Sequence, residues 1–432
     1  MMEMEEARNY LFGLHRFGCE TGAVRAKRAL ERLGNPQDNL NVIHVAGTNG
    51  KGSVCAYMSN ALMAQGYKVG LFTSPHLVKV NERIRINGMM ISDDDFLKYY
   101  QRVRAVSEEI QSEGKDGLAF FDFMFVMAVL YFVGHDTDYV VMETGLGGRT
   151  DATAALSTKL LSVITSISLD HTEILGDTME QIAMEKAGIV ARGVPLVAWK
   201  SSEESYRILE DNAIKCSSDA YFVDENSYKI HKIETKQVDF SLDNKYYRNS
   251  VFSIQNTGLY QVMNAALALE ALTKLPGADG FDVDQIVESV KKTHWEGRME
   301  EVENNIYLDG AHNPDGIAKF IETAGFMKGN HRNYLLFGAV REKDYDNMIK
   351  QIAGSDCFDG YILTQINNRR GLPVSNMQES FAKYTNKPVY VQEDNAKAFE
   401  FAKGLLSGDD ILFCAGSLYL VGALKELMGE EL

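Results

Sequence analysis

Residues 41–53 read NVIHVAGTNGKGS, and this stretch predicts how the chain around it folds. Its first half is apolar and predicts a short buried strand, and its glycines predict a tight turn that opens a helix. Glycines adopt backbone angles that a Cβ forbids, so several N–H groups can converge on one anion at the positive end of that helix. Lys51 can reach phosphate oxygens, and the Ser53 hydroxyl can face a divalent metal. The stretch therefore predicts a phosphate-binding loop.

The glycine spacing of this loop, GxxGKGS, is shorter than the Walker pattern GxxxxGK[ST], and a glycine stands directly before the serine. A glycine-rich turn that binds nothing is the alternative interpretation. We favour phosphate binding because the preceding strand, the lysine and the hydroxyl all occupy the positions that phosphate binding requires.

The size and charge of the chain limit its function. Its 432 residues exceed one ordinary hydrophobic core and predict two domains, or three. The content of 45% hydrophobic and 24% charged residues is typical of a soluble globular protein. A net charge of −16 disfavours a nucleic-acid-binding surface, because such a surface would repel phosphates. It does not exclude an anionic small molecule held by glycine amides, lysine and Mg²⁺.

The cysteine content and the N-terminal sequence indicate where in the cell the protein is expected. Five widely spaced cysteines form no CxxC pair, which predicts reduced thiols and a cytoplasmic protein. The acidic start MMEMEEARNY does not resemble a signal peptide. The longest apolar run, residues 118–133, contains Asp122 and is short for a membrane span, so it predicts a buried core helix. We therefore expect no membrane partner.

Polar side chains follow two predicted strands. Residues 138–143 predict an apolar strand that ends at Glu143, and His171 lies just beyond a strand predicted at 160–167. The carboxyl end of a parallel strand beside a phosphate loop is where a metal ligand is expected. The alternatives are a carboxylate that faces water and an ordinary structural histidine.

The pattern of predicted strands and helices indicates an α/β fold with two parts. The first is a P-loop-type, mostly parallel sheet domain over residues 1–296, with a small antiparallel sheet at about 219–255, where apolar residues alternate with polar ones. The second is a C-terminal Rossmann-like α/β domain over residues 297–432, which has no phosphate loop of its own. Its strands are predicted at 305–308, 334–338, 360–364, 388–391 and 410–414.

The motifs HVAGTNGKGS, TSPHL, ETGLGG, DHTEILGDT, MEKAGI, NAA, GR and LDGAHNP follow one another along nearly the whole chain. In this order they resemble the folylpolyglutamate synthase/dihydrofolate synthase family of the Mur ligase superfamily. The resemblance implies an ATP-dependent ligase that adds L-glutamate to the γ-carboxylate of tetrahydrofolate or its polyglutamates. The reaction would pass through an acyl phosphate and release ADP and phosphate.

The resemblance also implies roles for individual residues. Positions that match the family's nucleotide contacts are Thr48, Asn49, Gly50, Lys51, Gly52, Ser53, Asn264, Arg298, Asp309 and His312. Positions that match its metal ligands are Ser53, Ser74, Glu143, His171 and Lys186, the last as a lysine carbamylated by CO₂. The catalytic set would be Lys51, Lys186 and His171. The folate would contact Phe121, Arg83 and Asp151.

The expected cofactor is Mg²⁺, in two sites, with ATP as co-substrate and room for a monovalent cation. The expected partners are the small molecules ATP, L-glutamate and a reduced folate. We expect the protein to be a monomer and to bind no nucleic acid. Without the resemblance, Asn264 would be read as a surface amide and Lys186 as a solvated lysine.

Three positions depart from the family pattern, and other functions stay open. Thr150 and Ala154 replace an apolar residue and an asparagine near the expected pterin site, and Glu296 replaces a proline. The acceptor is therefore undecided between tetrahydrofolate and dihydropteroate, in a dedicated or a bifunctional enzyme. The alternatives from other classes are a P-loop kinase or regulatory NTPase and a non-catalytic ATP-binding scaffold.

Overall fold

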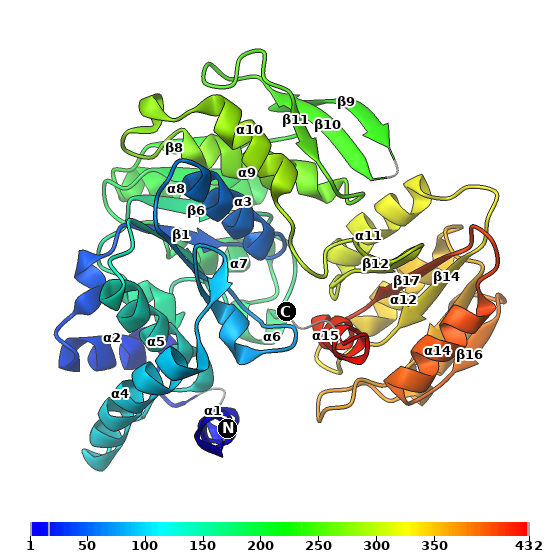
Figure 1. The fold of residues 1–432 in the computed structure, drawn as a ribbon, viewed down its shortest axis with the longest axis horizontal. Coiled ribbons are helices and arrows are strands. Elements are labelled where there is room, and N and C mark those ends of the chain that lie inside the picture. Colours follow the sequence, from blue (N-terminus) through cyan, green and yellow to red (C-terminus); the bar gives the residue numbers. More distant parts are fainter. Residues whose placement is uncertain (1, 16–17, 235, 430–432) are drawn as a thin grey trace.

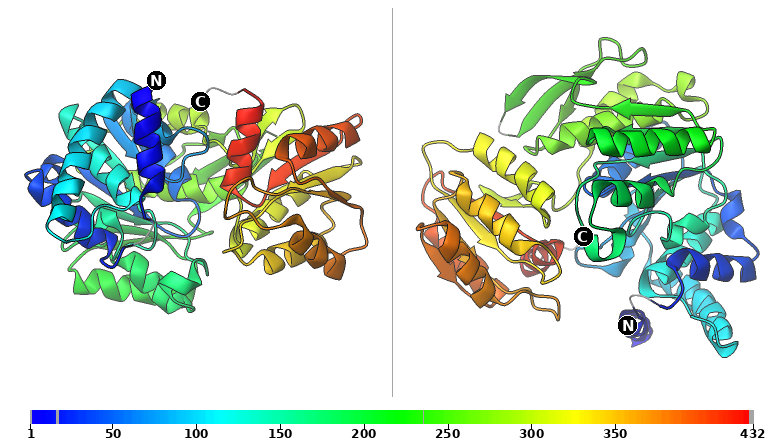
Figure 2. Two further views of the ribbon diagram at one scale, coloured as in Figure 1. Left: turned by 90° about the horizontal axis from the view of Figure 1, so that it is seen from below. Right: turned by 180° about the vertical axis from the view of Figure 1, so that it is seen from behind.

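The computed structural model describes residues 2–15, 18–234 and 236–429. It has two α/β lobes that lie side by side, with a small sheet attached to the first (Figure 1). The N-terminal lobe is built on an eight-stranded sheet, and the C-terminal lobe on a six-stranded sheet that begins at Glu300. Views from below and from behind show helices on both faces of each large sheet (Figure 2). The predicted fold class is confirmed.

The eight-stranded sheet has the order β4-β3-β2-β5-β1-β6-β7-β8. All neighbours pair in parallel except β2 with β3 and β3 with β4. The central strands are buried along their whole length, as expected for parallel strands covered on both faces. The strands are β1 (Val42–Ala46), β2 (Val69–Phe72), β3 (Ile84–Ile86), β4 (Met89–Met90), β5 (Tyr139–Glu143), β6 (Leu161–Ile164), β7 (Leu196–Trp199) and β8 (Ala220–Val223).

Ten α-helices of the described residues belong to this lobe. Helices α3, α9 and α10 pack together over one part of the sheet, whereas α1, α2, α4 and α5 form a second layer. The helices are α1 (Met2–Gly13), α2 (Gly22–Arg32), α3 (Lys51–Ala64), α4 (Asp93–Ser112), α5 (Phe120–Gly134), α6 (Thr172–Leu175), α7 (Met179–Ala187), α8 (Glu203–Lys215), α9 (Tyr260–Leu272) and α10 (Val283–Lys292).

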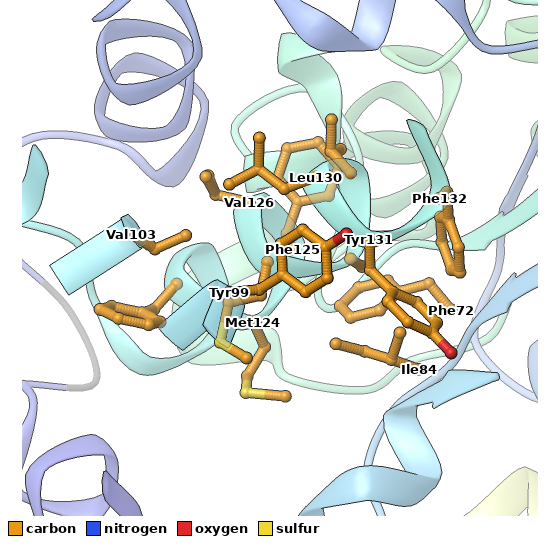
Figure 3. Packing of buried hydrophobic residues seen from close by; sticks show 14 of the residues in the cluster. Phe72, Ile84, Tyr99, Val103, Met124, Phe125, Val126, Leu130, Tyr131 and Phe132 are labelled. Carbon is orange, nitrogen blue, oxygen red and sulfur yellow. The ribbon is translucent and has the colours of Figure 1, made fainter. Parts of the chain in front are cut away.

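The apolar run at 118–133 forms the buried core helix that its composition predicts. Helix α5 is buried on nearly all sides, and its aromatic residues meet Phe72 of β2 and Tyr99 of α4 (Figure 3). Phe72 lies 6.3 Å from Phe125 and 5.6 Å from Phe121 between ring centroids. No helix in the described part of the chain is long and apolar enough to cross a membrane.

The small antiparallel sheet has the order β11-β10-β9 and starts later than predicted. Residues 220–223 form β8, which extends the large sheet in parallel with β7. Helix α8 separates these two strands, and a strand–helix–strand crossover places its second strand in parallel with the first. The alternating burial holds only beyond it, in β9 (Tyr228–Glu234), β10 (Gln237–Leu242) and β11 (Phe252–Ile254).

The C-terminal sheet has the order β12-β13-β17-β14-β15-β16, and only β12 runs antiparallel to its neighbour. The acidic sequence of β12 gave no strand prediction, whereas the five predicted strands are all present. Helices α11, α12 and α13 cover one face, and α14 and α15 the other. The elements are β12 (Glu300–Glu303), β13 (Ile306–Leu308), α11 (Pro314–Phe326), β14 (Asn333–Phe337), α12 (Tyr345–Gly354), β15 (Gly360–Leu363), α13 (Val374–Tyr384), β16 (Val389–Val391), α14 (Asn395–Leu405), β17 (Ile411–Ala415) and α15 (Leu418–Leu427).

The linker between the lobes, at residues 294–300, is ordered by hydrogen bonds. Glu300 accepts the Gly297 N–H at 2.7 Å and the Lys425 ammonium at 2.6 Å, and His294 lies 3.2 Å away. These contacts anchor the linker on the first strand of the C-terminal sheet.

Candidate active site

A cavity of about 1210 Å³ lies between the two lobes. The carboxyl ends of β1, β5 and β6 open into it from one side, and the loop after β13 from the other. All of the site residues that the sequence predicts line this cavity, namely Thr48, Asn49, Gly50, Lys51, Gly52, Ser53, Ser74, Arg83, Phe121, Glu143, Asp151, His171, Lys186, Asn264, Arg298, Asp309 and His312.

The predicted phosphate loop joins β1 to α3, and two of its glycines cannot be replaced without strain. Gly47 and Gly50 have φ angles of +150° and +85°. A Cβ on Gly47 would lie 1.8 Å from Thr165 Oγ1. Lys51 is the first residue of α3, and its ammonium donates to the carbonyl oxygens of Gly47 and Thr48, both at 3.2 Å. The lysine charge is thus held above the turn, at the helix N-terminus.

Oxygen atoms that suit Mg²⁺ gather beside this loop. The Ser53 hydroxyl is buried and has no hydrogen-bond partner among the described residues. Glu143, at the end of β5, is 3% exposed and accepts the Ser74 N–H at 2.9 Å, and burial raises its pKa. A cation near these oxygens would favour the ionised carboxylate. Among the described residues, no three or more His, Cys, Asp and Glu side chains are grouped so that they could hold a metal ion by themselves, so phosphate and water oxygens would have to complete the coordination of Mg²⁺.

The predicted second metal site is built around Lys186 and His171. Lys186 is buried, and its amine donates to the Gly47 carbonyl at 2.7 Å. Burial, helped by the charge of Lys51, lowers the pKa of Lys186 to about 7, so the uncharged amine that CO₂ requires is accessible near neutral pH. His171 lies beyond β6, with its Nε2 3.2 Å from the Lys343 ammonium.

The C-terminal lobe contributes polar groups that touch the N-terminal lobe. Asp309 follows β13 and accepts the Tyr260 hydroxyl of α9 at 2.5 Å and the Met299 N–H at 2.9 Å. His312 Nδ1 donates to the Gly310 carbonyl at 2.7 Å, and burial lowers the pKa of His312 to about 3. The imidazole is therefore neutral, with Nε2 as an acceptor.

The structure removes the alternative interpretation of Asn264 as a surface amide. Asn264 is buried in α9, and its Oδ1 has no hydrogen-bond partner among the described residues. A Cβ on Gly50 would lie 2.2 Å from that oxygen, so the amide packs directly on the phosphate loop.

The three predicted folate contacts lie at another part of the cavity wall. Arg83 donates to His76 Nδ1 at 2.8 Å and covers the Phe120 ring at 5.0 Å. Phe121 packs on Gly145, where a Cβ would lie 2.7 Å from the Phe121 ring.

Asp151 is occupied by its own loop. Its Oδ1 accepts the N–H and the hydroxyl of Thr153, and its Oδ2 accepts the N–H groups of Gly145 and Leu146. Four donors saturate the carboxylate, so Asp151 shapes the ETGLGG loop in this structure.

Sequence reasoning missed Asp170, Lys343 and Asn313. Asp170 accepts the Lys343 ammonium at 2.6 Å and the Asn313 amide at 2.9 Å. One signal was available, because Lys343 lies beyond the carboxyl end of β14 just as Glu143 ends β5. The reasoning that identified Glu143 from its place at a strand end could therefore also have identified Lys343.

Comparisons with known proteins agree with this geometry. The family model described as Mur ligase middle domain matches residues 45–272, and the one described as Mur ligase, glutamate ligase domain matches residues 297–418. A Bacillus subtilis dihydrofolate synthase/folylpolyglutamate synthase is 33% identical over 433 residues, which cover 98% of each chain. The chain belongs to the folylpolyglutamate synthase/dihydrofolate synthase family of Mur ligases. The resemblance inferred from the motifs is confirmed.

Solved structures extend this relationship to the whole fold. A Mycobacterium tuberculosis folylpolyglutamate synthase in complex with ADP superposes with a TM-score of 0.91 at 25% identity, over 100% of this chain and 99% of that one. The Escherichia coli protein FolC, in complex with DHPP and ADP, gives 0.84 at 26% identity, over 99% and 97%. The protein is thus an ATP-dependent glutamate ligase that forms C–N bonds.

Proposed function

We propose that this ligase adds L-glutamate to the γ-carboxylate of tetrahydrofolate and of its polyglutamates. The observation that carries the proposal is the single cavity that contains the phosphate loop, the Glu143 carboxylate and the Arg83 aromatic wall. Its volume, about 1210 Å³, exceeds the roughly 300–1,000 Å³ of ordinary small-molecule sites. Such a volume suits a reaction that brings a nucleotide, a pterin-containing acid and an amino acid together.

The chemistry begins with an unreactive carboxylate. An oxygen of the substrate carboxylate attacks the γ-phosphorus of ATP, the bond to the β-phosphate oxygen breaks, and ADP leaves. The phosphate-loop amides and Lys51 bind the triphosphate and offset the charge that spreads over the transferring group. The glutamate nitrogen then attacks the acyl phosphate carbon, and phosphate departs as the amide bond forms.

The chain's own residues would orient these steps and exclude water. The buried oxygens of Ser53 and Glu143, with Ser74, would hold one Mg²⁺, and His171 and carbamylated Lys186 a second. Mg²⁺ supplies charge stabilisation and a template for the phosphate oxygens. Arg298, Asp309 and His312 would complete the nucleotide site from the C-terminal lobe, so the acyl phosphate would form between two lobes, away from bulk water.

A bifunctional enzyme that also joins dihydropteroate to glutamate is the second candidate. The Bacillus subtilis relative is named for both activities, and the Escherichia coli relative was solved with DHPP. Both acceptors present a carboxylate to the same phosphoryl group, so the chemistry above serves either one.

We further propose a monomer with a domain boundary between residues 296 and 297, because both sides of the cavity come from one chain and the two large sheets share no strand in the described part of the chain. The five free thiols support our assignment to the cytoplasm.

The decisive experiment measures ADP release with ATP, Mg²⁺ and L-glutamate, with tetrahydrofolate in one reaction and dihydropteroate in another. Release with tetrahydrofolate alone supports a folylpolyglutamate synthase, and release with both supports the bifunctional enzyme. Release with dihydropteroate alone, or with neither acceptor in folded protein, would refute the tetrahydrofolate proposal. Omitting L-glutamate is the control, because a ligase completes its turnover only with the amine.

A further inference from the structure

Two asparagines from different lobes form a reciprocal amide pair. Asn49, in the phosphate loop, donates to Asn313 Oδ1 at 3.2 Å, and Asn313 donates back to Asn49 Oδ1 at 3.0 Å. The two residues are separated by 264 positions in the sequence. Asn313 is the N-cap residue of α11, so the N-terminus of this helix lies directly against the phosphate loop.

The pair is the centre of a larger set of contacts between the lobes. Asn313 also donates to Asp170 Oδ2 at 2.9 Å, and Asp170 Oδ1 accepts the Lys343 ammonium at 2.6 Å. Asn49 donates to Asp315 Oδ2 at 2.7 Å. We call Asn49, Asp170, Asn313 and Lys343 the interlobe latch. It includes no residue of the linker, so it joins the lobes independently of the chain connection.

The orientation of the Asn313 amide is determined by the helix that it caps. Its Oδ1 accepts the Gly316 N–H at 2.8 Å, which leaves Nδ2 to face Asn49 and Asp170. Asn313 is only 1% exposed, so its amide is costly to leave without hydrogen-bond partners. Losing these partners would destabilise the contact between the lobes. Both its donor and its acceptor are therefore needed.

We propose that Asn313 is a positioning residue that couples closure of the lobes to the geometry of the phosphate loop. Because its amide contacts Asn49 and Asp170 together, closure that forms these contacts orders the loop that receives the nucleotide phosphates along with the segment that carries His171. The contacts are polar, and water can replace them when the lobes separate, which suits a reversible interface. The catalytic consequence rests on the phosphoryl-transfer steps in the proposed function, whereas the closure itself does not.

Asn313→Asp tests this directly. The substitution keeps the oxygen that caps α11, since aspartate is as good an N-cap as asparagine. It removes the N–H donor and places a carboxylate against Asp170. We expect a larger radius of gyration in X-ray scattering without ligand, and at least tenfold weaker binding of MgADP by calorimetry. Asn347→Asp is the matched control, because it makes the same change at an exposed position in the first turn of α12 and should alter neither value.

The double variant Asn313→Asp/Asp170→Asn exchanges donor and acceptor across the same contact. The amide introduced at position 170 can donate to the new carboxylate and still offers an oxygen to Lys343. We expect it to restore most of the compactness and of the MgADP affinity. A wild-type radius and affinity in Asn313→Asp would overturn the proposal, and so would a double variant as impaired as the single one. Both measurements omit folate, so their results can be interpreted even if the acceptor is not tetrahydrofolate.

Discussion

Lys51 is the side chain on which phosphoryl transfer depends in our proposal. Replacing it with alanine leaves the loop without the ammonium that offsets charge on the γ-phosphoryl group, so we expect kcat/KM to fall about 10³-fold or more. The measurement is acceptor-dependent ADP release by Lys51→Ala. Lys215→Ala, at the exposed end of α8, should match the wild type. Near-normal turnover of Lys51→Ala would remove the phosphate-loop assignment.

Lys186 offers a test of the carbamate. A carbamylated amine keeps an N–H for the Gly47 carbonyl, which the lysine amine contacts at 2.7 Å, and adds two oxygens for a metal. We expect Lys186→Ala to be inactive and to recover part of its activity with short carboxylates such as acetate. Carbon-13 NMR in labelled bicarbonate should show a carbamate in the wild type. An unmodified Lys186 far from metal in an active complex would contradict this role.

Asp151 shows where a motif identifies a residue but not what it does. The sequence match suggests a folate contact, and the residue does line the cavity. Its four hydrogen-bond donors all come from its own loop, and burial raises its pKa to about 6. Only the folded loop reveals this saturation. The turn between residues 146 and 151 brings the N–H groups of Gly145 and Leu146 to the Asp151 carboxylate.

At the scale of elements, α15 meets the loop after β2 at one glycine. A Cβ on Gly422 would lie 2.1 Å from the Leu77 carbonyl oxygen, which is backbone and cannot move alone. Gly→Ala in a helix otherwise gains up to about 1 kcal/mol. We expect Gly422→Ala instead to lower kcat/KM at least tenfold, because the loop that carries Ser74 must shift.

Gly404 provides the control for this substitution. It lies in the last turn of α14 and would have no atom within 4 Å of an added Cβ. Gly404→Ala should therefore keep wild-type activity and unfold at the same or a higher urea concentration. Equal behaviour of the two variants would mean that the contact with Leu77 does not constrain α15.

The linker predicts a pH-dependent contribution to stability. Burial opposes ionisation of Glu300, but hydrogen bonds from His294 and Lys425 hold its pKa at about 2, below the ordinary 4.5. A lowered carboxyl pKa stabilises the fold above about pH 4.5, and this contribution is lost as the pH falls towards 2. Glu300→Gln should cost about 3 kcal/mol at pH 7 and progressively less below pH 4.5.

Urea unfolding of both proteins at pH 7 and at pH 3.5 measures this difference. A gap between wild type and Glu300→Gln that is as large at pH 3.5 as at pH 7 would contradict the ion-pair explanation. Glu303→Gln, on an exposed position of the same strand, is the control and should show little effect at either pH.

At the scale of the whole molecule, charge and metal act locally. The chain carries a net charge of −16, yet Lys51, Arg83, Arg298 and Lys343 all line the cavity between the lobes. Cations gathered at a site bind anionic substrates against the overall field. The charge of the whole chain therefore disfavours a nucleic-acid-binding surface but does not describe the pocket.

Metal removal should separate activity from folding. Each lobe has extensive apolar cores of its own, so folding does not depend on the phosphate-loop oxygens. We expect EDTA to abolish ADP release, and excess Mg²⁺ to restore it, with the thermal midpoint shifted by no more than about 2 °C. His171→Ala should raise the Mg²⁺ concentration needed for half-maximal rate. An unchanged titration would remove His171 from the metal site.

The sequence by itself determined the local features of this protein and its family. The glycine-rich turn after β1, the positions of most strands and the core helix at 120–134 follow from runs of neighbouring residues, so local patterns predict them, and the order of the motifs identifies the family. The tertiary structure alone decided that β8 joins the large sheet, that Asp151 is saturated, and that Asn49 meets Asn313. The reason is physical: the pairing of β8 with β7, the turn that brings four donors to Asp151 and the packing of the two lobes are three-dimensional arrangements, and no local period or spacing in the sequence records them.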